Sequence, residues 1–487
     1  MGDTTSQIER PLCVELDGTL ITSQTMWESI LAIARSRPAQ LFLAPWWLAG
    51  GIASFKRQLG RRTTLNPQSL PYRQDLLDHL RTQADAGRKL ILTTDDASEV
   101  TARAIARHLG LFDDVISRGQ SGGPSLAQAI HQKLGHGEFD YVGHAATDAS
   151  VWAEAKEGLI VGGSEGDHSP GPGPNQPKLA FAHRTDRPGD LLRSMRIKQW
   201  SKNLLLIVPM LVGHRLQLDH LADNLLRFLT AFMAFGCCAS SVYLINDLID
   251  LEADRRHPRK KLRPLAMGRV RIPTALLLAM CLLATGLVLG TTLLSLKFAA
   301  TLLIYMVLSI SYCLHFKRML LLDVIVLAGL YTHRIVAGGV ALLVWPLTPW
   351  LLAFATFLFL SLAFVKRFSE LVLANGDLAR DVPAANGRNY TAADTDLIRS
   401  VGPASGYLAV LVFCLYINSD DVAKLYQAPQ VLWGACPILF YWITRVWFLA
   451  ERKVLKEDPV LFALYDKASY LSGLLILLIL MLAKFWP

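Results

Sequence analysis

The chain has 487 residues, too many for one ordinary soluble core and enough for about three domains. It is 52% hydrophobic and only 18% charged, whereas soluble proteins carry about 25% charged residues. This composition indicates a membrane protein and argues against a disordered chain or a nucleic-acid-binding protein. The formal charge of +9 identifies no ligand, because membrane proteins concentrate such an excess in cytoplasmic loops.

Residues 1–162 have the pattern of a soluble α/β domain. The short apolar strands CVELDGTLI, KLILTT and FDYVG alternate with helical stretches, and this alternation is typical of a parallel sheet. The run LFLAPWWLAGGIASF, residues 41–55, is also apolar, but Pro45 interrupts it and it is shorter than the ~20 residues of a membrane span. We expect it to form a buried or membrane-touching helix.

Residues 163–188 are predicted to form a linker, because the stretch GGSEGDHSPGPGPNQP supplies Gly, Pro and polar side chains without an apolar period. Residues 189–487 are predicted to form an all-α membrane domain. Apolar segments recur there and predict about nine spans, near residues 203–213, 225–245, 273–293, 298–314, 320–344, 349–365, 403–418, 429–449 and 469–486.

Basic residues cluster in the connections after the even-numbered spans, with Arg255 to Arg271 after the second and Lys317 and Arg318 after the fourth. By the positive-inside rule these connections are cytoplasmic. The N-terminus shows no basic segment followed by a long apolar stretch, so no signal peptide is expected. The sequence therefore predicts a multi-pass membrane protein whose N-terminal domain is cytoplasmic.

Three carboxylates follow one another at the end of the second span. Asp247, Asp250 and Asp254 stand at i, i+3 and i+7, which predicts one helical face. Like charges repel unless a cation lies among them, and hard oxygen ligands suit Mg²⁺ bound to substrate phosphates. The bases that follow, among them Arg255 and Arg263, are candidate phosphate partners, although the positive-inside bias also accounts for them.

The motif of Asn246, Asp247, Asp250 and Asp254 resembles the first aspartate-rich motif of the UbiA superfamily of intramembrane prenyltransferases, and the likeness covers residues 190–487. The resemblance implies a bundle of about nine helices around a central cavity. It also implies that the three aspartates are catalytic and hold a Mg²⁺-bound diphosphate, with Asn246 beside them.

The branch of the superfamily is indicated by the segment after the fourth span. Aromatic prenyltransferases carry a second motif, DxxxD, there, whereas Asp323 stands alone in this chain. Tyr312, Lys317, Asp323 and Arg334 look like the branch that includes decaprenyl-phosphate phosphoribosyltransferase. That likeness implies transfer of 5-phosphoribose from phosphoribosyl diphosphate to a polyprenyl phosphate at the bacterial inner membrane. Prenyl transfer to an aromatic acceptor is the alternative enzyme, and a transporter or lipid-binding scaffold is the alternative class.

Such a site needs cations for several phosphates besides its metal. The candidates are Lys198, Lys202, Lys317, Lys366, Arg367 and Arg388, the last with Tyr390 in an NGRNY loop. Some of them could instead be interfacial anchors, and Glu370 could pair with Lys366 or Arg367. Arg334 is different, because a lone Arg inside an apolar span needs an anionic partner. For Asp458 and Asp466, orienting the acceptor and capping a helix are both open.

The segment VELDGTLI, residues 14–21, resembles the first motif of the haloacid dehalogenase-type phosphatases, which reads DxDGT in active members. Asp17 is retained, while Thr93 or Thr94, Lys133 and Asp148 match the later motifs and His144 stands where an acidic metal ligand is common. Glu15 replaces the Asp nucleophile, and its extra methylene displaces the attacking oxygen by over ~1 Å. We therefore expect an impaired phosphatase-like domain, and the alternative is removal of the product's 5-phosphate. The oligomeric state and lipid chain length stay open.

Overall fold

The computed structural model describes residues 10–118, 125–135, 138–144, 149–161, 178–181, 185–213, 221–374, 389–423, 425–455 and 458–485. Contacts divide the chain into two compact units. The first unit consists of Met1–Met195 with Leu244–Leu278, and the second of Arg196–Tyr243 with Ala279–Pro487. The predicted domain boundaries at 162 and 188 rest on composition and stay predictions.

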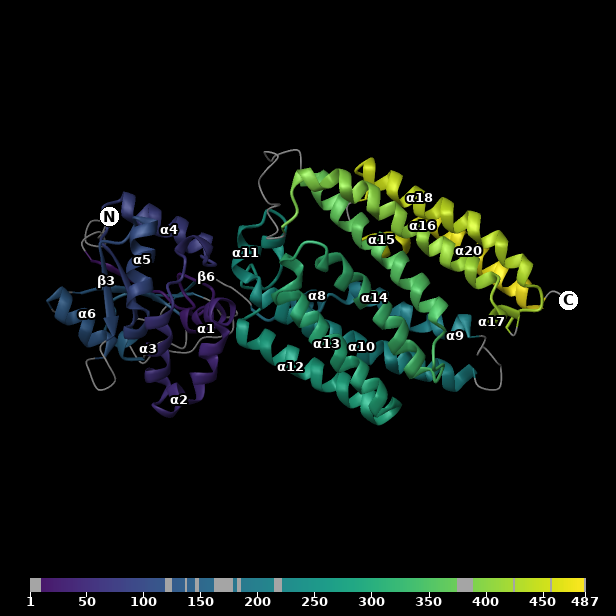
Figure 1. Ribbon diagram of the computed structural model, residues 1–487. Coiled ribbons are helices and arrows are strands. Elements are labelled where there is room, and N and C mark those ends of the chain that lie inside the picture. The colour runs from purple at the N-terminus through teal and green to yellow at the C-terminus, as the bar shows by residue number, and fades with distance from the viewer. Residues whose placement is uncertain are drawn as a thin grey trace. The chain divides into compact units, whose positions relative to one another are not determined.

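The first unit contains a six-stranded sheet in the order β3-β2-β1-β4-β5-β6 (Figure 1). Every neighbouring pair runs parallel, which confirms the predicted α/β class. The sequence predicts three of the strands, β1, β2 and β4, and the structure adds the other three. Their bounds are β1 (Leu12–Glu15), β2 (Leu90–Asp95), β3 (Asp114–Arg118), β4 (Asp140–Gly143), β5 (Gly158–Val161) and β6 (Lys178–Phe181).

Helices cover both faces of this sheet because alternate strand residues point in opposite directions. Val14 packs on one side with Leu80 and Ile105 of α4 and α5, and Cys13 packs on the other with Ile130 of α6. In sheets of this kind, ligands bind at the carboxyl ends of the strands, beyond the helices that cover the two faces. The helices of the domain are α1 (Thr25–Ser36), α2 (Ala44–Ala49), α3 (Ile52–Arg62), α4 (Gln74–Asp85), α5 (Glu99–Leu109), α6 (Leu126–Leu134) and α7 (Ala149–Glu154).

The apolar run 41–55 folds as a 3₁₀ turn, Pro38–Leu43, followed by α2 and the start of α3. Trp47 and Phe55 face inward and are 8% exposed. Phe42 and Trp46 face outward and are 84% and 77% exposed. The inward residues fit the buried alternative of the expectation, and contact of the outward residues with a membrane stays a prediction, because the two neighbouring tryptophans point in opposite directions.

Eight helices are long and apolar enough to cross a membrane in the part of the chain that the structure describes. The remaining predicted span, 203–213, forms a 3₁₀ stretch, Ile197–Ile207, and a five-residue helix α9, Val208–Val212, after α8 (Pro188–Ser194). The eight long helices are α10 (Leu221–Ile249), α12 (Ile272–Leu289), α13 (Leu296–Leu314), α14 (Leu322–Ala341), α15 (Pro349–Ala374), α16 (Thr395–Ile417), α18 (Ala435–Glu451) and α20 (Lys467–Phe485).

Small residues let the helices of the second unit approach closely. A Cβ atom added at Gly402 of α16 would lie 2.1 Å from Trp447 of α18, a distance that no side chain can occupy. The indole nitrogen of Trp447 in turn donates to Ser361 Oγ of α15 at 3.1 Å. Glycine at such a contact is typical of membrane bundles, where packing replaces the hydrophobic effect. These helices position the buried charged groups described next.

Candidate active site

The three predicted aspartates lie across a junction between two helices. Helix α10 ends at Ile249 and α11 (Leu251–Arg256) begins two residues later, with Asp250 as the residue between them. Asp250 has φ −87° and ψ 5°, outside the helical range, although the backbone hydrogen bonds continue through it. The prediction that all three carboxylates share one helical face stays a prediction, although Asp247 and Asp254 both accept from Arg263 across this junction.

Asp247 and Asp254 converge on one cation. Both are almost fully buried, at 3% and 2% exposure. Nη1 of Arg263 donates to Asp247 Oδ1 at 3.0 Å and also to Asp254 Oδ2, while Nζ of Lys260 lies 3.8 Å from Asp254. Burial raises the pKa of Asp254, and attraction to Arg263 opposes that rise. The two carboxylates thus lie close enough to share a positive charge.

This arrangement brings together two of the three predicted metal ligands. Among the described residues no group of three or more His, Cys, Asp or Glu side chains is placed to hold a metal ion. Asp247 and Asp254 nevertheless fit Mg²⁺, since two hard carboxylates already share one cationic partner, and Mg²⁺ completes its shell with water and substrate oxygens. A metal at the aspartates stays a prediction, as does the role of Asn246, which is half-buried in the last turn of α10.

Arg255 is engaged within the first unit. Its Nη1 and Nη2 donate to the two carboxylate oxygens of Glu28 at 3.0 and 2.7 Å, and Nη1 also donates to the Ser69 carbonyl at 3.2 Å. Both charged side chains are 8% exposed. This paired, buried guanidinium holds α11 against α1, and its predicted contact with a substrate phosphate stays a prediction.

In the second unit, two lysines and a tyrosine meet at Asp458. Nζ of Lys202 and Nζ of Lys366 lie 2.8 and 3.3 Å from Asp458 Oδ2, and the Tyr331 hydroxyl donates to the same carboxylate at 3.1 Å. Burial alone would raise the pKa of Asp458, but attraction to Lys366 and Lys202 outweighs it and holds the pKa well below its ordinary value. Asp458 therefore stays ionised and keeps both cations in place.

Asp458 also caps a helix and borders a cavity. Its Oδ1 accepts the backbone N–H of Val460 at 3.1 Å, at the start of α19 (Pro459–Ala463), so its capping role is present. An open cavity of about 780 Å³ is lined by Asp458 together with Lys198, Gln199 and Tyr465, among others. Asp466, in contrast, pairs with Arg445 at 2.7 Å. The cavity gives Lys198 and Asp458 access to a ligand.

Arg334 is a buried cation without a carboxylate partner in the described part of the chain. It is 4% exposed and donates to the Leu330 carbonyl at 2.9 Å, to Tyr305 Oη at 3.3 Å and to Asn203 Oδ1 at 3.4 Å. The rings of Phe235, Tyr305 and Tyr331 lie 5.0 to 5.7 Å from its guanidinium carbon.

Asn203 adds an unsatisfied amide beside Arg334. The side chain is 1% exposed, and its Nδ2 has no hydrogen-bond partner among the described residues. A buried N–H without an acceptor costs about 1–3 kcal/mol, and an uncompensated buried charge costs more. Both groups would be satisfied together by an anion bound beside them.

Arg367 differs from Arg334 because its charge is matched inside the protein. Arg367 and Asp323 are 1% and 0% exposed, and Nη2 of Arg367 donates to Asp323 Oδ1 at 3.0 Å. Tyr312 donates to the same carboxylate at 2.7 Å, and Glu370 accepts from Arg367 at 2.6 Å. These groups satisfy one another, so their geometry is that of a structural ion pair, and their contact with substrate stays a prediction.

Three predicted residues of the bundle remain. Lys317 is half-buried in a short 3₁₀ turn, Phe316–Arg318. Tyr390 is 3% exposed, and its hydroxyl accepts the backbone N–H of Leu321 at 3.3 Å. Arg388 lies outside the described residues.

In the N-terminal domain, one carboxylate oxygen of Glu15 is held by three neighbouring groups. Glu15 Oε2 accepts from Thr19 Oγ1 at 3.1 Å and from the backbone N–H of His144 at 3.1 Å, and it lies 2.8 Å from His144 Nδ1. That hydrogen bond raises the pKa of His144. Asp17 is held by the backbone N–H and hydroxyl of Thr25 at 2.7 and 2.8 Å, and burial raises its pKa to about 6.

The other phosphatase-like residues are not all brought to this edge of the sheet. Thr93 Oγ1 donates to the Val14 carbonyl at 3.2 Å. Lys133 pairs with Asp114 at 2.8 Å, at the first residue of β3. In a parallel sheet the first residue of one strand lies at the opposite edge from Glu15, the last residue of β1. Asp148 lies outside the described residues.

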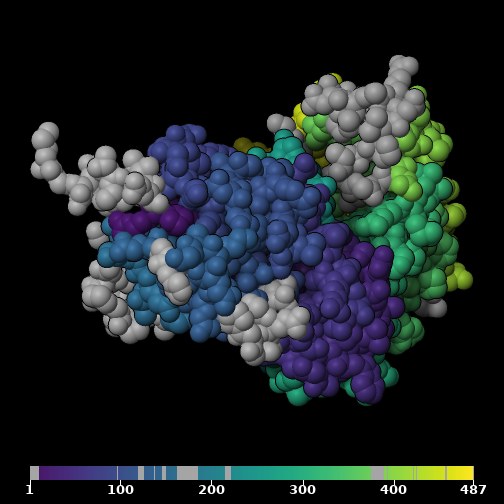
Figure 2. Space-filling view, turned by 90° about the vertical axis from the view of Figure 1, so that its left-hand side faces the viewer, coloured from purple at the N-terminus to yellow at the C-terminus, as the bar shows by residue number. Residues whose placement is uncertain are grey.

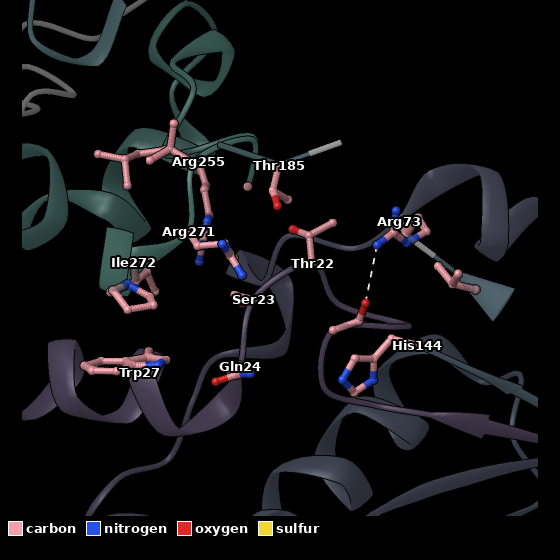
Figure 3. A pocket seen from close by; sticks show the side chains of 16 residues that line it. Thr22, Ser23, Gln24, Trp27, Arg73, His144, Thr185, Arg255, Arg271 and Ile272 are labelled. Atoms are coloured by element: carbon pink, nitrogen blue, oxygen red, sulfur yellow. Dashed lines mark hydrogen bonds between the residues drawn. The ribbon is translucent and has the colours of Figure 1, made fainter. Parts of the chain in front are cut away.

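A cavity of about 440 Å³ in the first unit lies beside His144 (Figure 3). Arg73, Arg255 and Arg271 contribute to its wall, and Arg73 donates to the Gly18 carbonyl at 3.4 Å. Glu15, Asp17, Thr93 and Lys133 are not among the residues that line it. The cavity thus borders the predicted phosphatase residues through His144, which contacts Glu15, and two of its arginines, Arg255 and Arg271, are paired with Glu28 and Asp186.

A family model described as the UbiA prenyltransferase family matches residues 206–466, more than half of the chain. The chain belongs to the UbiA prenyltransferase family. It is therefore a membrane transferase. The matched range contains the three aspartates and the buried Arg334 and Arg367, whereas Lys202 lies before it. The likeness of the N-terminal domain to haloacid dehalogenase-type phosphatases stays a prediction.

Several relatives of this UbiA-family chain are known. The protein y4nM of Sinorhizobium fredii is 35% identical over 478 residues, which cover 96% of this chain and 89% of y4nM. A Mycolicibacterium smegmatis protein named decaprenyl-phosphate phosphoribosyltransferase is 38% identical over 236 residues, covering 48% of this chain and 72% of the relative. The structure of an Archaeoglobus fulgidus UbiA homologue bound to GPP and Mg²⁺ aligns with a TM-score of 0.44 at 17% identity, over 60% of this chain and 99% of the homologue.

Sequence reasoning misses three residues that surround Arg334. Tyr331 precedes Arg334 by three positions on α14, and this spacing on one apolar helix could have indicated a shared polar face. Asn203 follows Lys202 directly in the segment QWSKN, so its amide could have been noted with that lysine. Tyr305 lies on α13 and carries no signal, because its contact with Arg334 depends on how two helices pack.

Proposed function

We propose that this UbiA-family enzyme transfers 5-phosphoribose from phosphoribosyl diphosphate to a polyprenyl phosphate. The observation that carries the proposal is Arg334, a buried cation without a carboxylate partner among the described residues, beside the unsatisfied amide of Asn203. Such a pair favours an anionic ligand inside the bundle. Relatives named decaprenyl-phosphate phosphoribosyltransferase, at 32% to 38% identity, favour this donor and acceptor over other anions.

The roles of the residues follow from their charges. We assign Arg334 and Asn203 to one phosphate of the substrates, and Lys198 and Lys202, beside the cavity at Asp458, to another. Asp247 and Asp254, with Asp250, would hold Mg²⁺, which supplies positive charge to the diphosphate leaving group. The bond from C1 of the ribose to the diphosphate breaks, and a phosphate oxygen of the lipid forms the new bond to C1. No general base is needed, because the attacking phosphate is already anionic.

The location forms part of the proposal. Basic residues fill the connection between α10 and α12, where Arg255, Arg256, Arg259 and Lys260 follow the aspartates. The positive-inside rule therefore favours a cytoplasmic position for this connection. We propose the inner membrane of a bacterium as the site of the reaction, with the N-terminal domain in the cytoplasm.

The donor can be tested directly with membranes that contain the full chain. Incubation with labelled phosphoribosyl diphosphate and decaprenyl phosphate should move label into the organic phase, and omission of the lipid should prevent this. A parallel reaction with a labelled polyprenyl diphosphate and an aromatic acceptor should give no prenylated product. Label transfer only in the second reaction would show that the chain is an aromatic prenyltransferase instead.

Arg334→Met should remove activity without removing the fold. Among the described residues, no carboxylate is paired with Arg334, so the substitution removes a costly buried charge and leaves no opposite charge behind. The temperature of thermal unfolding should therefore stay the same or rise. Loss of one preorganised cation at a developing anion should lower the rate by about 10²–10³-fold. Label transfer and thermal unfolding in detergent measure both effects. A variant that unfolds early, or that keeps full activity, would show that Arg334 is structural.

The N-terminal domain should release no phosphate from ribose 5-phosphate. Three hydrogen bonds hold the oxygen of Glu15, and Lys133 lies at the far edge of the sheet. Phosphate release from ribose 5-phosphate is measured with the full-length protein, since the proposed transfer does not use this compound. Release above the level of a Glu15→Gln control would show that the domain is an active phosphatase.

A further inference from the structure

Five large apolar side chains lie exposed together on the N-terminal domain, at the 3₁₀ turn Pro38–Leu43, on α2 and at the start of α3. We call them the α2 patch: Phe42 (84% exposed), Leu43 (45%), Trp46 (77%), Leu48 (50%) and Ile52 (68%). The segment forms part of the surface in Figure 2, where it belongs to the purple region. Soluble proteins scatter such residues singly, and a contiguous group marks an interaction site.

The α2 patch is held in place from below. Trp47, Phe55 and Leu59 pack with Ile33 of α1 in a small core of their own, and each is 8% exposed or less. The guanidinium of Arg62 covers the Trp47 ring at 4.8 Å. The outward position of Phe42 and Trp46 is therefore fixed by a folded support, and the patch presents aromatic rings to its surroundings.

The chain segment that carries the α2 patch has charged residues of a single sign. No Asp or Glu occurs between Glu28 and Asp75. The same interval contains seven basic residues, namely Arg35, Arg37, Lys56, Arg57, Arg61, Arg62 and Arg73. Of these, Arg35, Arg37, Arg61 and Arg62 are exposed, while Lys56 is paired with Asp95 and Arg35 with Glu252. Exposed Trp and Phe beside cations match the interface of an anionic membrane, where aromatic rings lie at the head groups and bases bind lipid phosphates.

We propose that the α2 patch inserts into the head-group layer of the membrane that the chain itself spans, with anionic phospholipid as its partner. The domain belongs to the same chain as the eight apolar helices, so a weak interfacial contact would form at high effective concentration. Helix α2 has six residues and cannot cross the bilayer. The contact is therefore interfacial, and it is independent of the proposed transfer reaction.

Photocrosslinking in the full chain tests this contact. Benzoylphenylalanine replaces Trp46 in one variant and Val100 of α5 in the other, because Val100 is a single apolar residue that is 65% exposed outside the patch. After irradiation in proteoliposomes, mass spectrometry should find phospholipid adducts at position 46 and not at position 100. Equal adducts at both positions, no lipid adduct at position 46, or a protein adduct there in place of lipid would overturn the proposal.

The charge of the partner is tested in the same liposomes. Adding phosphatidylglycerol to phosphatidylcholine should raise the lipid adduct at position 46, and Arg37→Glu with Arg61→Glu should remove that increase. Arg81→Glu is the matched control, since Arg81 is an exposed Arg of α4 away from the patch. Anionic lipid would be overturned as the partner if, without the Arg→Glu substitutions, the adduct yield at position 46 did not change with phosphatidylglycerol. An equal effect of Arg81→Glu would overturn it as well. Neither variant touches the proposed active site.

Discussion

Asp247→Asn should abolish transfer while leaving the protein folded. Asp247 is 3% exposed and shares Arg263 with Asp254, so the substitution removes one of two converging negative charges at the proposed metal position. Asparagine keeps the shape and can still accept a hydrogen bond from Arg263. Because transition-state charge on the leaving group loses its stabilisation, the rate should fall by about 10³-fold or more.

The matched control is Asp223→Asn on the same helix α10. Asp223 lies in the first turn of α10, is 60% exposed and pairs at 2.8 Å with Arg227, four residues along the helix. The same chemical change there should leave the rate within twofold, since exposed pairs of this kind contribute about 0.3–0.5 kcal/mol to stability. Label transfer at several Mg²⁺ concentrations measures both variants. Full activity of Asp247→Asn would remove the aspartates from the mechanism.

Arg367→Met should destabilise the bundle more than any other single change considered for this chain. Asp323 is fully buried, and its partner Arg367 is 1% exposed. Removing the guanidinium leaves a buried carboxylate without its cation, which costs about 3–5 kcal/mol. Thermal unfolding in detergent should therefore begin at a clearly lower temperature than in the unmodified protein.

A double variant distinguishes a broken pair from a general packing defect. Arg367→Met with Asp323→Leu removes both charges, so much of the lost stability should return, as it does when a buried ion pair is replaced by apolar residues. Arg334→Met is the comparison on α14, where no such loss is expected. If Arg367→Met and Arg334→Met had the same effect on unfolding, the distinction between a matched and an unmatched buried arginine would be wrong.

The architecture was accessible from the sequence because burial leaves a periodic trace. The long apolar segments predict the eight membrane helices closely, and the alternation of strands and helices predicts the parallel sheet. The short first span was not predictable, since Ile197–Ile207 adopts a 3₁₀ conformation that composition does not reveal. The break at Asp250 is a local backbone event within a helical pattern, and no residue such as Gly or Pro signals it.

The charged residues of the site were predicted by type, but their partners were not. Lys202 and Asp458 are 256 positions apart, and Arg367 and Asp323 are 44 positions apart, so only the packing of the helices pairs them. The sequence shows Arg334 and Arg367 as two similar cations in apolar spans. The structure separates them, because one is matched by a carboxylate and the other is surrounded by rings and neutral oxygens.

In the N-terminal domain too, the sequence predicts residue types but not which residues the fold brings together. The segment around Glu15 and Asp17 predicts a strand, and β1 (Leu12–Glu15) lies there. Lys133 matches a motif by its position in the sequence, yet it pairs with Asp114 at the other edge of the sheet. Spacing along a chain does not determine which edge of a parallel sheet a helical side chain reaches.

The mass of the lipid product tests the central claim most directly. Purified full-length protein is incubated with phosphoribosyl diphosphate, decaprenyl phosphate and Mg²⁺, and the organic extract is analysed by mass spectrometry. The proposed function predicts decaprenyl phosphate enlarged by one phosphoribosyl unit, absent with the Asp247→Asn variant and present with Asp223→Asn. Unchanged decaprenyl phosphate, with a prenylated aromatic compound formed in the parallel reaction, would contradict it.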